Sequence, residues 1–184
     1  MLTLADINHL EVPDQLFSYA EAYRAASVIL CRKIENDDTL YTWPHATVIL
    51  MLAAHAVELF LKGALLKRGV EISRTHNVQQ LAEQYRETFQ DAAFAWEIPF
   101  ANPLSETELI GQMKQLWPHI NETELRRSIA TTPAPSILYR YPVNNEGMEW
   151  RGVYGFTSTG FLPRLEQLEL DFRRLRLEMD KLAS

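Results

Sequence analysis

The residues best suited to chemistry are a few polar side chains inside an otherwise apolar segment, residues 43–68. In a helix they would share an arc of roughly 80° and form one narrow stripe. They are Thr47, His55, Glu58 and Lys62. A buried charge is costly unless it is paired, and Glu58 precedes Lys62 by four residues, so we expect these two to pair. His55 lies three residues before Glu58, within hydrogen-bond reach.

Two interpretations of this stripe remain open at this point. The first is a histidine–carboxylate site inside a groove. The second is a polar stripe that faces the gap before the next helix, or a second subunit, and carries no ligand.

Apolar residues at spacings of three and four predict the helices that must position these side chains. The segment 43–68 is apolar on nearly every face, which is typical of the central helix of a bundle. Asp14 is expected to cap the first helix, Gly69 to end the second, and Asn77 with Gln80 to cap the third. Together they predict an all-α antiparallel bundle of four to five helices. The predicted helices cover about residues 14–36, 43–68, 78–96, a stretch starting at 105, 122–130 and a stretch starting at 163.

Proline and glycine punctuate residues 131–160, which predicts a long loop or a short hairpin that pairs Tyr139–Val143 with Met148–Phe156. Behind it, apolar residues follow a heptad seam to the end of the chain. The seam residues are Leu165, Leu168, Phe172, Leu175, Met179 and Leu182. We expect this last helix to pack along a neighbour in the same chain, with a second copy as the alternative.

Composition sets further bounds. The chain has 184 residues, of which 47% are hydrophobic, which suits one domain spanning residues 1–184. A net charge of −6 does not favour broad nucleic-acid binding, although residues 61–90 carry five bases against three acids. The single Cys31 allows no internal disulfide, and the sequence suggests neither a metal nor a cofactor. Polar residues interrupt the apolar stretch Val48–Leu66, so we expect a buried helix and a cytoplasmic protein with no membrane association.

Two segments carry a family resemblance. Residues 54–69, AHAVELFLKGALLKRG, resemble the second-helix signature of HEPN domains, and residues 75–81, THNVQQL, resemble the start of the third helix in that family. Residues 140–142, Arg-Tyr-Pro, resemble a later family element, and residues 18–33 have the Tyr- and Ala-rich character of its first helix. These matches follow the family order over roughly residues 14 to 182.

The resemblance implies a bundle of four to five helices, often dimeric. It implies a link to nucleotidyltransferase partners, toxin–antitoxin pairs or other prokaryotic defence systems. Many members are metal-independent ribonucleases with an arginine, four to six intervening residues and then a histidine. Other members lack that pair and are thought to bind nucleotides or RNA, or to serve as interaction modules.

None of the five histidines of this chain follows an arginine at the family spacing. Arg68 precedes His76 with seven residues between them, and Arg74 is too close. The leading hypothesis is therefore a non-catalytic module for a nucleotide, RNA or protein partner. One alternative is a metal-independent endoribonuclease that uses Arg68 and His76, and another is a purely structural dimeric protein. In the structural interpretation, the ring of His76 closes the turn before the third helix or caps that helix.

In the leading hypothesis the groove is lined by residues from three segments. Arg140 suits a phosphate because its guanidinium is bidentate, and Tyr141 offers a surface on which a base can stack. The other groove residues are His55, Glu58 and Lys62, with Arg68 and His76 beside them.

Overall fold

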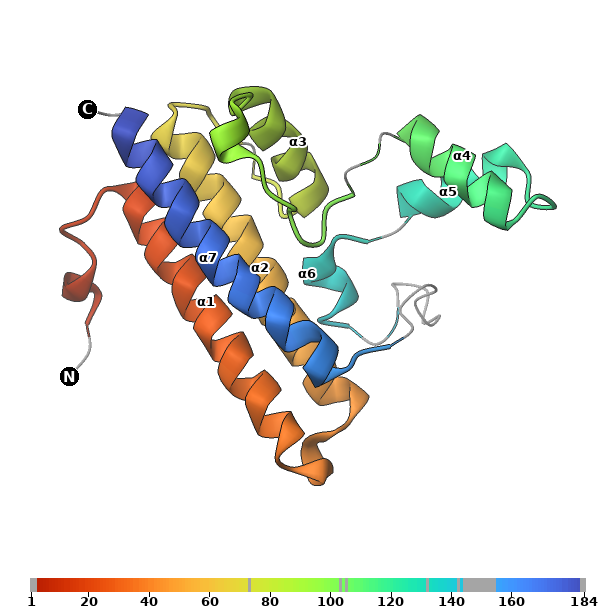
Figure 1. The fold of residues 1–184 in the computed structure, drawn as a ribbon, viewed down its shortest axis with the longest axis horizontal. Coiled ribbons are helices and arrows are strands. Elements are labelled where there is room, and N and C mark those ends of the chain that lie inside the picture. The colour runs from red at the N-terminus through yellow and green to blue at the C-terminus, as the bar shows by residue number, and fades with distance from the viewer. Residues whose placement is uncertain are drawn as a thin grey trace.

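Three long helices lie side by side and form the body of the protein (Figure 1). The computed structural model describes residues 3–72, 74–102, 104, 106–131, 133–141, 143 and 155–182. The long helices are α1 (Val12–Glu35), α2 (Trp43–Lys67) and α7 (Ser158–Leu182). The short α3 (Val78–Thr88) and α6 (Pro135–Leu138) pack on α2, and η1 (Leu4–Asp6), η2 (Asp38–Leu40) and η3 (Ala92–Phe94) are 3-10 turns. The regular elements of this part of the chain are all helical, so the predicted all-α bundle is confirmed.

The helices α4 (Glu106–Leu116) and α5 (Glu122–Thr131) pack on each other and extend away from the three long helices (Figure 1). Asn121 caps α5, since its side chain accepts a hydrogen bond from the backbone N–H of Glu124 at 2.8 Å. Ile110 of α4 and Leu125 of α5 are buried in this pair. The bundle proper is thus built from α1, α2, α7 and α3.

The central helix is α2, as predicted from its apolar composition. Its Phe60 ring stacks on Phe172 of α7 with centroids 4.0 Å apart and also contacts Phe17 of α1 at 5.1 Å. Gly63 allows α1 to come close, because a Cβ atom at this position would lie only 2.8 Å from Phe17 Cε1. By length and composition α2 could cross a membrane, but 67% of its apolar window is buried inside the protein, which marks a core helix.

The last helix, α7, packs on α1 and α2 of the same chain. The prediction that its heptad seam packs within the chain is therefore confirmed. The seam residues Leu165, Leu168, Phe172, Leu175 and Met179 are all buried, whereas Leu182 is exposed. A buried polar contact also joins α7 to α1: Arg24 lies 2.9 Å from Glu169 and donates a hydrogen bond to Glu21. Burial of the arginine is tolerated because both carboxylates compensate its charge.

Three predicted helix ends differ from the structure. The first helix begins at Val12, with Pro13 in its first turn and Glu11 as N-cap, so Asp14 lies inside the helix. The third ends at Thr88, not near Trp96, because the chain turns there into η3, whose N-cap Asp91 accepts a hydrogen bond from Ala93 N–H.

The last helix begins at Ser158, ahead of Pro163. A proline in the second turn removes only one backbone hydrogen bond, so the helix extends past it toward its N-terminus. The predicted hairpin does not begin at Tyr139, because Tyr139 and Arg140 form the turn that closes α6. Its remaining residues lie largely outside the described part of the chain.

Candidate functional site

A buried carboxylate collects three nitrogen donors. Glu58 on α2 is 1% exposed. Its Oε1 lies 2.7 Å from Lys62 Nζ and 2.9 Å from His76 Nδ1, and its Oε2 lies 3.5 Å from His55 Nδ1. The two contacts within α2 follow from the positions of residues three and four apart on one helix face. The predicted Glu58–Lys62 pair and the predicted reach of His55 to Glu58 are both confirmed, and His76 joins them. We call these four residues the Glu58 cluster.

The turn between α2 and α3 holds His76 in this position. Gly69 ends α2 with a φ of 72°, as predicted, and its N–H and that of Val70 bond back to Leu66 and Leu65. These are the two hydrogen bonds of a Schellman motif, in which glycine avoids the steric cost of a left-handed residue.

At the other side of the turn, Asn77 caps α3 by accepting hydrogen bonds from the backbone N–H groups of Gln79 and Gln80. Thr75 accepts a hydrogen bond from Asn77 N–H and donates one to the Gln80 side chain. Since both sides of the turn are hydrogen-bonded, the backbone that carries His76 is fixed.

Glu58 is ionised over the ordinary pH range. Burial raises its pKa, but hydrogen bonds from His55 and Lys62, the charge of Lys62 and the hydrogen bond from His76 outweigh it and lower the pKa to about 2. An ionised carboxylate only accepts hydrogen bonds. His76 Nδ1 therefore carries a proton, and this N–H group donates a hydrogen bond to Glu58. The His76 side chain is 69% exposed, which leaves its Nε2 facing solvent. The site therefore presents the His76 imidazole at the surface, held in one orientation by the buried carboxylate of Glu58.

His55 has a second neighbour that the sequence did not single out. The ring of Tyr23 on α1 meets the His55 ring edge to face, with centroids 4.5 Å apart. Tyr23 occupied one of the apolar positions of the first helix, so its only signal was a role in packing. This contact fixes the orientation of His55, whose side chain is 34% exposed.

The remaining predicted residues lie elsewhere. Thr47 donates its hydroxyl to the Pro44 carbonyl and does not join the cluster. Arg68 is the exposed C-cap of α2. It follows Glu58 by ten residues, which amounts to about 15 Å of helix rise. Arg140 and Tyr141 are exposed and follow α6, where Tyr139 packs on the ring of Phe100. The structure thus brings four of the predicted residues together and leaves these four apart from them.

The described residues contain no group of three or more His, Cys, Asp and Glu side chains that could hold a metal ion. Two cavities at another end of the bundle are lined by residues 34–46 and 156–159 and include none of the predicted site residues.

Comparison with known families supports the resemblance seen in the sequence. The family model of the HEPN domain matches residues 45–134, just under half of the chain. That range contains both central segments of the resemblance, 54–69 and 75–81, and therefore the whole Glu58 cluster. Residues 18–33 and 140–142 lie outside it. No curated protein matches the chain, and no solved structure matches it either. Residues 45–134, which include nearly all of the central helix α2, are thus recognised as a HEPN domain.

Proposed function

We propose that this protein is a non-catalytic HEPN module that binds a nucleotide or RNA through phosphate contacts at the Glu58 cluster. The observation that carries the proposal is the His76 imidazole, held by a buried carboxylate through Nδ1 while Nε2 faces solvent. In the neutral ring with its proton on Nδ1, Nε2 only accepts hydrogen bonds, so it donates to a phosphate oxygen when the ring takes up a second proton. Such a charge-assisted contact positions a nucleic acid without reading its sequence.

Basic residues on the segment that carries His76 support the same ligand. Arg68 and Arg74 are exposed on the same connecting segment, and neither has an ion-pair partner among the described residues. In contrast, Lys67 is neutralised by Asp14 and Asp180. The net charge of −6 would oppose a long nucleic acid elsewhere on the surface, so binding is expected to be local and sensitive to salt.

The distance of Arg68 from the Glu58 cluster supports binding of RNA over its cleavage. Cleavage of RNA without a metal requires a base, an acid and a cation next to the phosphorane at defined geometry. Arg68 lies about 15 Å along α2 from Glu58, and no contact joins it to His76. The pair proposed for a divergent site is thus not assembled around the phosphate position that His76 offers.

One observation favours a second candidate, a metal-independent endoribonuclease. A buried carboxylate that fixes one ring nitrogen of an exposed histidine is also the arrangement that orients a general base. In this alternative His76 would take or give the proton at Nε2, and a cation would have to come from Arg74, from Arg68 after movement of the turn, or from a second subunit.

The further context is also proposed. A homodimer is supported by the face of α1 and α2 that carries His55. Tyr19 lies one turn before Tyr23, Val48 lies two turns before His55, and both are 42% exposed. Light scattering should give twice the chain mass, and Val48→Asp should return the mass of one chain.

A nucleotidyltransferase or antitoxin partner and a cytoplasmic location follow from the family context alone. Co-purification with the product of the neighbouring gene would test the partner.

Fluorescence anisotropy with a labelled single-stranded RNA tests the binding proposal. Wild type should bind, His76→Ala should weaken binding at least 10-fold, and the control His119→Ala, which changes an exposed histidine just beyond the end of α4, should leave it unchanged. Incubation of the same RNA in EDTA distinguishes the candidates. Intact RNA with retained binding supports the module, whereas cleavage abolished by His76→Ala supports the endoribonuclease. Absence of binding to RNA and to nucleotides would refute the proposal.

A further inference from the structure

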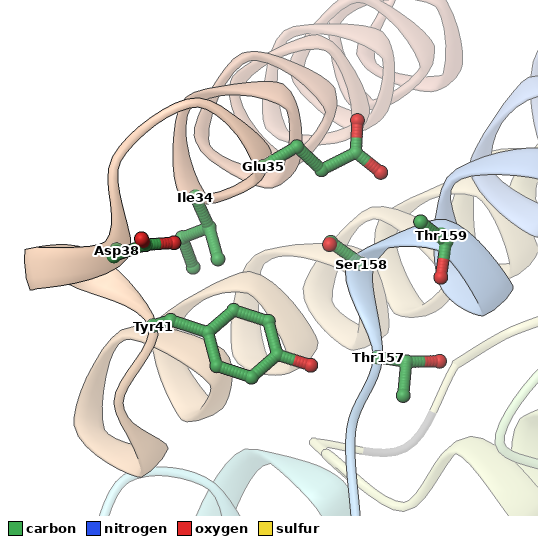
Figure 2. Close-up of a pocket in the computed structure, with 7 residues that line it drawn as sticks. All are labelled: Ile34, Glu35, Asp38, Tyr41, Thr157, Ser158 and Thr159. Carbon is green, nitrogen blue, oxygen red and sulfur yellow. The ribbon is translucent and has the colours of Figure 1, made fainter.

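A second site with different chemistry lies where α1 ends and α7 begins. A cavity of about 470 Å³ opens there (Figure 2). This volume falls within the usual range for small-molecule sites. Its lining comes from the end of α1, the turn η2 and the first turn of α7. The lining residues are Ile34, Glu35, Asp38, Tyr41, Thr157, Ser158 and Thr159.

Ser158 is the residue that marks this cavity as a binding site. It is only 3% exposed, and Figure 2 shows its hydroxyl pointing into the cavity from the first turn of α7. Its backbone carbonyl accepts from Cys31 Sγ at 3.5 Å, but its side-chain Oγ has no hydrogen-bond partner among the residues the structure describes. The hydroxyl meets no protein group where it faces the open cavity, so a ligand there can pair with it in place of water.

Two carboxylates decide the charge of that ligand. Glu35 and Asp38 both line the cavity, no basic residue lines it, and neither carboxylate forms an ion pair within the described ranges. The first turn of α7 opposes them with its positive end, but a helix dipole is equivalent to only about half a charge at its terminus. Two full negative charges outweigh it, so the cavity favours a cation.

Aromatic rings decide the kind of cation. A smaller cavity of about 100 Å³ adjoins the first and shares Ile34 and Tyr41 with it. Trp43 and Phe156 also line this smaller cavity, and the Tyr41 and Trp43 rings are 53% and 43% exposed. Aromatic faces attract organic cations and cover their apolar portions. A metal ion is disfavoured because the described residues offer no group of three ligating side chains.

We propose that the cavity between α1 and α7 binds a small organic ammonium ion. Its charged nitrogen lies between Glu35 and Asp38 and donates a hydrogen bond to the unpaired Ser158 hydroxyl, while its apolar part contacts Tyr41 and Trp43. Because both carboxylates are exposed to solvent, the affinity is expected in the millimolar range. The site is separate from the Glu58 cluster and does not depend on the function proposed for it.

A charge series of nearly equal shape tests the proposal on the full chain. The probes are 2-phenylethylammonium, the neutral 2-phenylethanol and the anionic phenylacetate, each titrated into ¹⁵N-labelled protein and followed by amide shifts. The ammonium should shift the amides of the lining residues and bind at least 10-fold tighter than the alcohol, and phenylacetate should not bind there. Equal binding of the alcohol, tighter binding of phenylacetate, or no response at the lining residues would overturn the proposal.

Variants tie the binding to the named residues. Glu35→Gln and Asp38→Asn should each weaken binding of the ammonium several-fold, and the double variant should abolish it. Ser158→Ala should weaken it without changing the thermal midpoint, since the hydroxyl has no partner to lose. The control Glu87→Gln removes an exposed carboxylate at the end of α3 and should change nothing. Unchanged affinity in the double variant would refute the assignment, and all of these variants should bind RNA as wild type does.

Discussion

Replacement of Glu58 by Gln tests the central interaction of the site. The substitution keeps the shape of the side chain but removes the charge that three nitrogen donors share. Lys62 Nζ at 2.7 Å and His76 Nδ1 at 2.9 Å lose a charge-assisted hydrogen bond, and His55 at 3.5 Å loses its contact with an ionised carboxylate. The variant is expected to fold, because the amide oxygen still accepts a hydrogen bond.

The magnitude follows from the pKa of Glu58, which the fold lowers from 4.5 to about 2. A depressed carboxyl pKa means that the ionised form stabilises the folded state above pH 4.5 and that this stabilisation is lost as pH falls to 2. The full depression is equivalent to about 3 kcal/mol. Because the introduced amide keeps part of the hydrogen bonding and the His76 ring can be solvated, we expect Glu58→Gln to cost about 2 kcal/mol at pH 7.

Urea unfolding monitored by circular dichroism, repeated from pH 7 down to pH 3, measures both effects. Wild type should lose stability steeply below pH 4.5, and the variant should show a shallower acid dependence. Glu166→Gln is the control: it breaks a surface pair with Arg32 whose side chains are more than half exposed, so it should cost less than about 0.5 kcal/mol. A Glu58→Gln variant as stable as wild type at pH 7, with the same acid dependence, would refute the reasoning.

Three further substitutions test the packing that positions the site, each by thermal and urea unfolding. Gly63→Ala should destabilise by about 1–3 kcal/mol because its Cβ would lie 2.8 Å from Phe17 Cε1; a more stable protein would contradict the close approach of α1 and α2. Gly111→Ala, with no atom within 4 Å of the added Cβ in α4, should stabilise that helix by up to about 1 kcal/mol, and a loss would mean that the helix is differently packed. Phe172→Ala should cost about 3–5 kcal/mol because its ring stacks on Phe60, and a cost below about 1 kcal/mol would argue against α7 as part of the core.

The sequence predicted the parts of the fold that depend on local spacing. The uniform hydrophobicity of α2, its stop at Gly69 and the cap at Asn77 are all encoded within a few residues. The end of α3 was predicted wrongly for a physical reason. Phe89, Ala92 and Trp96 are spaced as on a helix, and the rings of Phe89 and Trp96 do pack on Tyr85, but the chain reaches Trp96 through the 3-10 turn η3. Periodicity reports which side chains are buried, and it does not report the hydrogen bonds of the backbone.

The site was predictable only in part for a similar reason. Glu58 with His55 and Lys62 follows from helix geometry, so spacing alone predicted their contacts. His76 lies 18 residues from Glu58, and its ring reaches the carboxylate only because the α2–α3 turn folds back. The same limit applies to Tyr23 on α1, whose contact with His55 depends on the packing of two helices. The cavity next to Ser158 lies between the end of α1 and the start of α7, which are far apart in the sequence, and no local pattern indicates it.

The ¹⁵N signals of the histidine rings, recorded with and without single-stranded RNA, test the central claim most directly. We predict that Nδ1 of His76 carries a proton bonded to Glu58 and that RNA shifts the Nε2 signal toward the protonated form, while His119 shows neither effect. A His76 ring without a proton held on Nδ1, with an Nε2 signal indifferent to RNA, would contradict both the cluster and the function proposed for it.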